Sequence, residues 1–521
     1  MEPRPASRRA GRYIDRVRLP VAFLALAHLG CAAGASTRPS DAPRPGATQE
    51  AALSKAAPPA SCHYAIAFSP GEDAHLDVHA RCDSAADAFV ATDPRVAPFV
   101  RTVSSVGEAA PNGAAFPGGS EVRYRVALAE AARVHDSVDV ALASGEAYLA
   151  PLGTAILRPS GLKGAVLTLE IAVPPGSAFA TGLTSRGGGY RLLAEEVPFA
   201  TYAVFGRFAV ERILVPGPLA LEERSVRARP VEAPPSPAMS EVTVATLPGS
   251  LVTDGPSRLR WLRDATEAVT EFYRGFPVDR ALVVVIPRAG EREVVHGRVV
   301  ATGGASVLLE VGELAETAAL YRDWILVHEL FHLGFPSVQK DARWLDEGLA
   351  TYFEPIIRAR AGWQTKESVW SEFARDMWQG LDAVERTGMF RAESRSGMYW
   401  GGAIVSMLAD VRAREASDGA VGLEDGLRAV VAEGGNATRF WSLERVVAAI
   451  DRRLGSPVTR TLVDEHGQAG RPVELARLFV SLGVRPRTGG IELLPYAGLA
   501  SVRDAIVEPP QLAARRHGQA H

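Results

Sequence analysis

Two histidines and a glutamate stand close together in an apolar stretch of the chain. His328 and His332 are four positions apart, so on a helix their imidazoles lie on one face, about one turn from each other. Two imidazoles at this spacing can bind one tetrahedral metal ion. Glu329 follows the first histidine and can reach a water molecule on such an ion without binding the ion itself. Gly334 and Pro336 would end the helix.

The neighbours of these three residues favour a metal site over a chance occurrence of the motif. The segments Ile325–Val327 and Leu330–Phe331 are apolar, so the polar residues lie in a stretch patterned for burial. Burying two histidines and a glutamate without a compensating partner would be costly. A zinc ion supplies that compensation, and we expect one Zn²⁺ per chain. The alternative is a pair of core histidines with ordinary hydrogen-bond partners.

A second segment, Trp344–Glu354, resembles the gluzincin metallopeptidases, in which a second helix carries the third zinc ligand in a string like W-L-x-E-G-x-A-x-Y. This resemblance implies that Glu347 is the third ligand. Glu354 lies one heptad further, roughly on the same helical face, and is the rival. Asp346 points elsewhere on a helix, so we expect it to cap the helix or face solvent. Thr351 either orients a ligand by a hydrogen bond or is a hydroxyl on the helix face.

A third segment, Met398–Arg412, resembles the glycyl aminopeptidase family and its aminopeptidase N relatives. In those proteins a tyrosine starts a Y-x-K-G-A string and a long apolar helix follows. The match implies that Tyr399 donates a hydrogen bond to the oxyanion of the tetrahedral intermediate. Gly401 stands where the family usually has lysine. The alternative is a tyrosine that closes a helix N-terminus and has no part in catalysis.

One departure from these relatives concerns the end of the substrate. In the aminopeptidases a glycine-rich string before the zinc helix ends in an acid that holds the free amine of the substrate. The corresponding region here is Thr302–Glu310, in which the glycines are present but the acid is not where the motif would place it. Glu310 and Glu354 are the nearest other acids in the sequence. We therefore expect endopeptidase action slightly more than aminopeptidase action.

The N-terminal region has the pattern of an export signal. Residues 1–18 carry several arginines, an apolar run spans 19–29, and Cys31 follows directly after a glycine. The run is shorter than the roughly 20 apolar residues of a membrane span. The pattern resembles a bacterial lipoprotein signal, so we expect export to the cell envelope and a lipid anchor on Cys31 that attaches the protein to a bacterial membrane. Cleavage without lipidation, or an uncleaved anchor, are the alternatives.

The remaining sequence predicts an α+β fold in two main parts. After the export segment at 1–31, residues 32–60 read as a flexible tether rich in Ala and Pro. Short alternating runs over 61–230 predict a β-sandwich-like domain. A proline-rich stretch then precedes a thermolysin-like catalytic domain at 240–495, mostly helical in its C-terminal half, and a polar tail at 505–521.

The cysteines and the charge narrow the context further. Cys62 and Cys82, the other two of three cysteines, are close in sequence and in an exported protein are expected to form a disulfide. The alternative is a pair of buried thiols. The formal net charge of -3 gives no basic field, so we expect no nucleic-acid partner.

These observations predict zinc-dependent hydrolysis of peptide bonds in a peptide or protein substrate. Glu329 would take a proton from the attacking water, while zinc and Tyr399 would stabilise the oxyanion. The main alternative is a catalytically degenerate lipoprotein that keeps the peptidase fold and binds peptides without cutting them.

Overall fold

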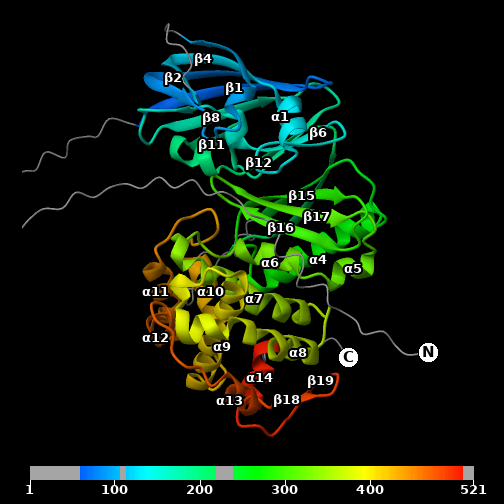
Figure 1. Ribbon diagram of the computed structural model, residues 1–521, viewed down its shortest axis with the longest axis vertical. Helices are drawn as coiled ribbons and strands as arrows, with labels where there is room; N and C mark the ends of the chain where they lie inside the picture. Colours follow the sequence, from blue (N-terminus) through cyan, green and yellow to red (C-terminus); the bar gives the residue numbers. More distant parts are fainter. Residues whose placement is uncertain (1–58, 106–112, 219–238, 509–521) are drawn as a thin grey trace, which may run out of the picture. The chain divides into compact units, whose positions relative to one another are not determined.

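The computed structural model describes residues 59–105, 113–218 and 239–508 (Figure 1). Cys31, the export segment and nearly all of the tether therefore lie outside the described residues. Within the described ranges, no helix combines the length and the apolar character needed to cross a membrane.

The first part of the fold is a sandwich of two sheets. Strand β1 (Ser61–Ser69) alternates buried and exposed residues, and the ring of its Phe68 lies 5.7 Å from that of Phe205 in the second sheet. The order in the first sheet is β10 (Ser185–Arg186), β11 (Gly189–Leu193), β8 (Val166–Ala172), β1, β2 (His75–Val90), β4 (Ala115–Val126) and β3 (Val100–Ser105), with β7 (Arg158–Pro159) paired to β2. The second sheet has the order β5 (Leu142–Ser144), β6 (Ala147–Pro151), β12 (Tyr202–Gly206) and β9 (Ala178–Thr181), and helices α1 (Leu128–His135) and α2 (Leu152–Ala155) accompany it.

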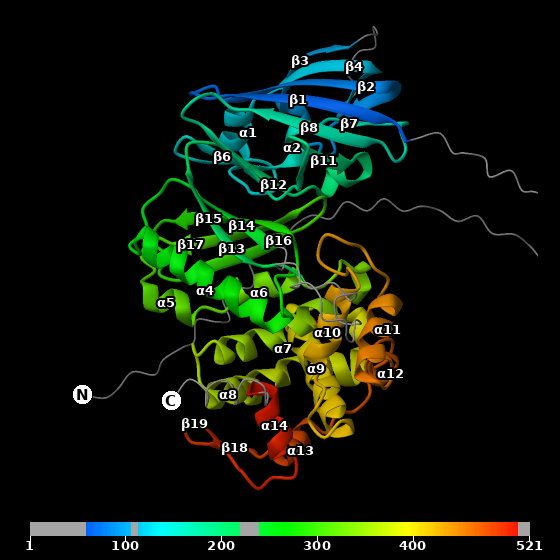
Figure 2. The same ribbon diagram turned by 180° about the vertical axis from the view of Figure 1, so that it is seen from behind.

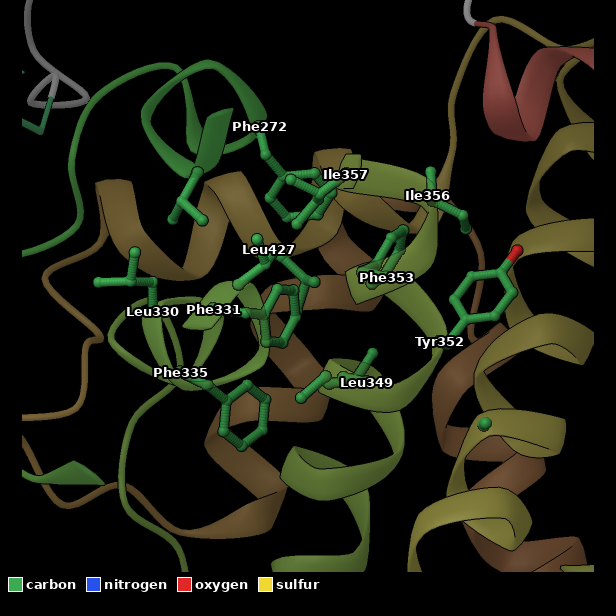
Figure 3. Packing of buried hydrophobic residues seen from close by; sticks show 14 of the residues in the cluster. Phe272, Leu330, Phe331, Phe335, Leu349, Tyr352, Phe353, Ile356, Ile357 and Leu427 are labelled. Carbon is green, nitrogen blue, oxygen red and sulfur yellow. The ribbon is translucent and has the colours of Figure 1, made fainter. Parts of the chain in front are cut away.

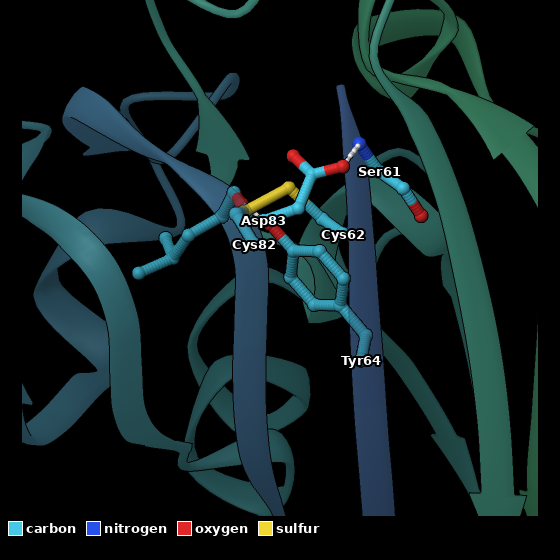
Figure 4. The surroundings of a disulfide bond; sticks show 6 residues. Ser61, Cys62, Tyr64, Cys82 and Asp83 are labelled. Carbon is cyan, nitrogen blue, oxygen red and sulfur yellow. Dashed lines mark hydrogen bonds between the residues drawn. A yellow bond between two sulfur atoms is a disulfide. The ribbon is translucent and has the colours of Figure 1, made fainter. Parts of the chain in front are cut away.

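A disulfide joins the first two strands of the sandwich. Cys62 of β1 and Cys82 of β2 are direct partners in the antiparallel register, and their sulfur atoms are bonded (Figure 4). Beside them, the Ser61 backbone N–H donates a 2.9 Å hydrogen bond to the Asp83 carboxylate, and the Tyr64 hydroxyl donates one of 2.7 Å to the Leu157 carbonyl. Cys62 and Tyr64 are fully buried, so the disulfide is part of the sandwich core.

A third sheet forms the base of the second part of the fold. Its order is β13 (Ala209–Pro216), β14 (Met239–Thr246), β15 (Arg280–Arg288), β17 (Ala305–Gly312) and β16 (Val294–Val300), and β16 is an antiparallel edge strand. Strand β13 pairs with β14 across the proline-rich stretch. Strand β13, which lies inside the range 61–230 predicted for the β-rich domain, therefore belongs to this third sheet.

The second and third sheets share a small apolar core. Leu149 and Val204 of the second sheet pack with Leu282 and Val284 of β15 and Leu308 of β17. Every residue of β12 is buried, since its two faces contact different layers. The four-stranded sheet is thus the middle layer between the first sheet and the third sheet.

Helices make up most of the chain after the third sheet. The ring of Phe331 in α6 packs against those of Phe272 of α4 and Phe353 of α7 in a large core that also contains Leu349 and Leu427 (Figure 3). The helices are α4 (Gly255–Tyr273), α5 (Thr317–Arg322), α6 (Ile325–His332), α7 (Arg343–Arg360), α8 (Lys366–Asp376), α9 (Arg395–Ala416), α10 (Leu423–Ala432), α11 (Leu443–Leu454), α12 (Val458–His466), α13 (Leu475–Ser481) and α14 (Ala500–Val507), with the hairpin β18 (Val484–Arg487) and β19 (Gly490–Leu493) near the end.

Two predictions from the sequence, the fold class and the start of the polar tail, can be compared with this structure. The predicted fold class, an α+β chain with a β-sandwich-like part before an increasingly helical part, is confirmed. The polar tail was expected to start at 505, which is wrong, because Ile506 and Val507 at the end of α14 are buried in the helical core.

Candidate metal centre

Helix α6 presents both histidines of the motif. The Asp323 carboxylate caps its start by accepting a 2.7 Å hydrogen bond from the Ile325 backbone N–H. Past its end, Gly334 leaves no room for a side chain, because a Cβ there would overlap the ring of Tyr273. The helix is held by its apolar residues, and this burial carries His328 and His332 into the interior, where they are only 2% and 9% exposed.

Helix α7 brings Glu347 to the same point. Its Oε2 lies 3.5 Å from Nε2 of His328 and 3.5 Å from Nε2 of His332. The three candidate ligand atoms all lie within 4.8 Å of one another. The structure therefore brings together the three residues that the sequence had assigned to a metal.

The donor set and its spacing fit a zinc ion. Tetrahedral zinc with ligand bonds of about 2.0–2.2 Å holds its ligands roughly 3.3–3.6 Å apart. The two distances to Glu347 match that spacing, and its Oε2 is buried without a hydrogen-bond partner. A buried carboxylate oxygen left in this state is costly unless a cation compensates it.

Asp346 supports the second histidine, contrary to the expectation that it faces solvent or caps the helix. Its Oδ1 lies 2.7 Å from Nδ1 of His332. Although burial alone lowers the pKa of His332, Asp346 and Glu347 together raise it well above its usual value. In the neutral ring that a metal ion requires, Nδ1–H donates to Asp346 and the lone pair would lie on Nε2, which faces Glu347 and His328.

The environment of Glu347 and Glu329 differs strongly. Burial alone raises the pKa of Glu347, but the nearby imidazoles of His328 and His332 outweigh it and hold that pKa far below the usual range. Glu329 has no such partner among the described residues, and burial raises its pKa to about 7. Gly297 of the edge strand β16 lies against it, and a Cβ there would crowd the Glu329 side chain. Glu329 thus sits between β16 and the metal ligands.

Tyr399 reaches the group from α9. Its ring stacks on that of His328 with 5.6 Å between the centroids. Burial, followed by the negative charges of Glu347 and Glu329, raises the pKa of Tyr399 well above its usual value. Its hydroxyl therefore stays protonated and can donate a hydrogen bond.

Two back-to-back glycines allow α9 to come this close. Helices α7 and α9 lie side by side in both ribbon views (Figures 1 and 2). A Cβ at Gly348 would overlap the backbone of Gly402, and one at Gly402 would overlap the carbonyl of Trp344. Because Gly348 follows Glu347 directly and Gly402 lies one turn after Tyr399, the contact fixes the distance between ligand and tyrosine. The neighbouring Gly401, where the relatives have lysine, packs against Gly380.

The rival residues on α7 lie in other surroundings. Glu354 is buried in an ion pair with Arg358, four residues later on the same helix. It is not part of the metal-ligand group. The Thr351 hydroxyl donates a 2.7 Å hydrogen bond to the carbonyl of Glu347, the ordinary contact of a hydroxyl on a helix face.

The glycine-rich string contacts the β-sandwich. The Thr302 carbonyl accepts a 3.1 Å hydrogen bond from the Thr201 backbone N–H, and a Cβ at Gly303 would strike Leu192. Glu310, at the end of the string, forms a two-pronged ion pair with Arg288, at 2.6 and 2.8 Å. Both sequence candidates for an amine-binding acid, Glu310 and Glu354, are therefore engaged with arginines.

Sequence reasoning missed several residues that border the site. Asp346 gave no distinguishing signal, because its partner comes from another helix. Gly297 was visible only as one glycine within a strand-like run. Arg298, which pairs with Asp139 of the sandwich and lowers the pKa of Glu329, had no signal at all. Trp324 contacts the His328 ring edge-on at 5.1 Å and is 45% exposed, so it borders the site on the solvent side.

Comparison with known proteins places this arrangement in a structural context. No family model matches the chain, and neither does any curated protein sequence. Among solved structures, an aminopeptidase N family protein from Idiomarina loihiensis is similar over 81% of this chain and 78% of its own, with 13% identity and a TM-score of 0.57. An M1 zinc metallopeptidase from Deinococcus radiodurans is similar over 80% of this chain and 94% of its own, with 14% identity and a TM-score of 0.44. The first likeness shows a shared fold, and the resemblance to gluzincin aminopeptidase N relatives is confirmed at that level.

Proposed function

We propose that this chain is a zinc-dependent peptidase with one zinc ion per chain. The observation that carries the proposal is the convergence of His328, His332 and Glu347 within 4.8 Å, in a buried site next to an unpaired glutamate. The three ligands leave a fourth tetrahedral position for a water molecule or a substrate, as catalytic zinc sites do.

The residues around this position have the properties that peptide hydrolysis requires. A zinc ion held there would supply Lewis-acid activation of a water molecule and of the scissile carbonyl. Glu329, with its pKa raised to about 7 by burial, accepts a proton from the attacking water and returns it to the leaving nitrogen. The protonated hydroxyl of Tyr399 donates a hydrogen bond to the oxyanion that develops on the carbonyl oxygen.

Two substitutions test the proposal. His332→Ala should lose nearly all zinc in elemental analysis, whereas Glu329→Gln should keep the zinc and lose activity on a peptide library by roughly 10²–10⁴-fold. Glu367→Gln, at an exposed glutamate of α8, is the matched control and should change neither. Equal zinc in wild type and His332→Ala, or a Glu329→Gln variant within about threefold of wild-type activity, would refute the assignment. Zinc and peptide binding with no turnover in the wild type would favour the degenerate lipoprotein instead.

We also propose that the enzyme does not require a free N-terminus in its substrate. The support is that Glu310 and Glu354 are both held in ion pairs with arginines. Without a free carboxylate, a substrate ammonium would lose its hydration with little in return. Acetylated and free versions of one good peptide should be cut at similar rates. A strong preference for the free amine would restore the aminopeptidase assignment.

For the location, we propose export to a bacterial cell envelope and a lipid anchor on Cys31. The arginine-rich start, the short apolar run and the cysteine after Gly30 support it, and the Cys62–Cys82 disulfide suits an oxidising compartment. Cys31→Ser should move the protein from the membrane fraction to the soluble fraction. A mature N-terminus mapped to another residue would contradict the anchor.

A further inference from the structure

Arginines border the metal centre on three different elements. Arg343, in the first turn of α7, lies 3.5 Å from Oε1 of Glu347 and is 60% exposed. Arg298 of β16 acts on Glu329 from the side of the sandwich and pairs with Asp139. The positive charge of Arg395, the first residue of α9, acts to lower the pKa of Tyr399 and that of His296. Three cationic side chains therefore lie near the candidate metal centre.

The carboxylates near the site are already engaged. The carboxylates with the largest effects on the pKa values of Glu329, Tyr399 and His296 are Glu347, Asp346 and Glu310, besides Glu329 itself. Glu347 belongs to the metal group, Asp346 contacts His332, and Glu310 is paired with Arg288. Arg343 and Arg298 are thus paired with Glu347 and Asp139, whereas Arg395 has no ion-pair partner among the residues that the structure describes.

Arg395 is the arginine best placed to contact a substrate. It lies one turn before Tyr399, so the two side chains share one face of α9. It also lies close enough to His296 to lower the pKa of that histidine, and His296 precedes Gly297, the residue that packs against Glu329. Arg395 is exposed, and among the residues that the structure describes its guanidinium has no ion-pair or hydrogen-bond partner. Its charge thus faces the side of the site between α9 and β16.

We infer that the site selects substrates that carry a carboxylate close to the scissile bond, and that Arg395 binds this carboxylate. The inference rests on the proposed peptidase function and names its substrate class. An exposed guanidinium pairs with a carboxylate in two parallel hydrogen bonds, which fixes the orientation of the substrate as well as its charge. A basic group in the same place would be repelled by Arg395 and Arg298.

The carboxylate can come from an acidic side chain or from the C-terminus of a short peptide. Both sources are tested with one blocked, neutral peptide that the enzyme cuts. In one series, glutamate replaces glutamine at each position beside the scissile bond. In the other, the C-terminal amide of a shortened peptide is replaced by a free acid. The series that raises kcat/KM identifies the source.

The variants test whether Arg395 is responsible. In the wild type, the carboxylate should raise kcat/KM by about threefold to tenfold, and the gain should shrink at high salt. Arg395→Gln should remove this gain while keeping the rate on the neutral peptide, and Arg395→Glu should favour lysine over glutamate at the same position. Arg391→Gln removes the same charge from a nearby exposed position and should keep the preference. Equal losses in Arg391→Gln and Arg395→Gln, or no preference in the wild type, would overturn the inference.

Failure of the inference can be distinguished from failure of the peptidase function. Cleavage of the neutral peptide with no effect of a carboxylate overturns the inference alone. If nothing is cut, calorimetric binding of the acidic and neutral peptides to zinc-loaded Glu329→Gln protein still decides the inference. Tighter binding of the acidic peptide, abolished by the added Arg395→Gln change, supports it, and equal binding of the two peptides overturns it.

Discussion

Asp346 and Glu347 are adjacent in α7 yet contact the same histidine from different sides. The Asp346 carboxylate holds Nδ1 of His332 at 2.7 Å, while Glu347 faces Nε2 of the same ring at 3.5 Å. A carboxylate behind a metal-binding histidine fixes its tautomer and its ring orientation and makes the ligand nitrogen more basic. In the proposed metal centre, Asp346 would therefore position His332 without touching the metal itself.

Asp346→Ala should weaken zinc affinity by roughly tenfold to a hundredfold, because the His332 ring loses its orientation. Competition with a chelator of known affinity measures this directly, without any turnover. Asp346→Asn keeps an oxygen that can accept from Nδ1–H and should lose less. Asp341→Ala, at an exposed position in the turn before α7, is the control. Zinc affinity in Asp346→Ala equal to that of the control would remove Asp346 from the site.

At the level of single residues, the sequence predicted the candidate metal ligands but not the side chains that contact them. The helical spacing of His328 and His332 is a local property, and the structure places both imidazoles as that spacing requires. Glu347 and Tyr399 came from a resemblance to known strings, and they too lie at the group. Asp346 and Arg298 contact partners from distant parts of the chain, and no local pattern reports such contacts.

At the scale of elements, the site depends on how closely α7 and α9 approach. Gly348 and Gly402 meet backbone to backbone, and the helices cross without intervening side chains. Tyr399 stacks on His328 only because this crossing brings the start of α9 near α6. The glycines were visible in the sequence, but their contact was not, since it joins helices separated by α8.

Gly402→Ala should push α9 away from α7 and lower both stability and activity. Overpacking of a tight contact typically costs about 1–3 kcal/mol. Denaturant unfolding gives the free energy, and kcat on a library peptide reports the displacement of Tyr399. Gly255→Ala is the matched control, because a Cβ there would meet only the flexible end of Arg258 at 3.9 Å. A Gly402→Ala variant as stable and as active as Gly255→Ala would show that the contact between α7 and α9 can accommodate a methyl group.

At the scale of the whole molecule, the β-sandwich and the part that follows it share more structure than the sequence predicted. The prolines near 230 predicted a boundary between two domains, yet β13 precedes them and pairs with β14 beyond them. Pairing between strands is set by tertiary context, which a local run of prolines does not reveal. Leu149 and Val204 of the four-stranded middle sheet also pack against one face of the third sheet. Each part would expose apolar residues of this shared core to solvent if the other part were missing.

A fragment that begins at β14, residues 239–521, should therefore be insoluble or unfolded. It would lack β13 and expose the apolar face that carries Leu282, Val284 and Leu308. Exposed apolar patches of this kind promote aggregation. The soluble fraction and the near-ultraviolet circular dichroism of this fragment can be compared with those of residues 59–521. A soluble fragment with a sharp thermal transition would contradict the prediction.

The position of β1 also determines the order in which the first sheet can assemble. Strand β1 lies between β2, which follows it at once, and β8, which begins only at Val166. A growing chain can therefore close the β1–β2 hairpin long before the parallel partner of β1 exists. The Cys62–Cys82 bond lies within that hairpin, so its oxidation needs no later part of the chain. Once formed, it keeps β1 and β2 in register before β8 pairs with β1.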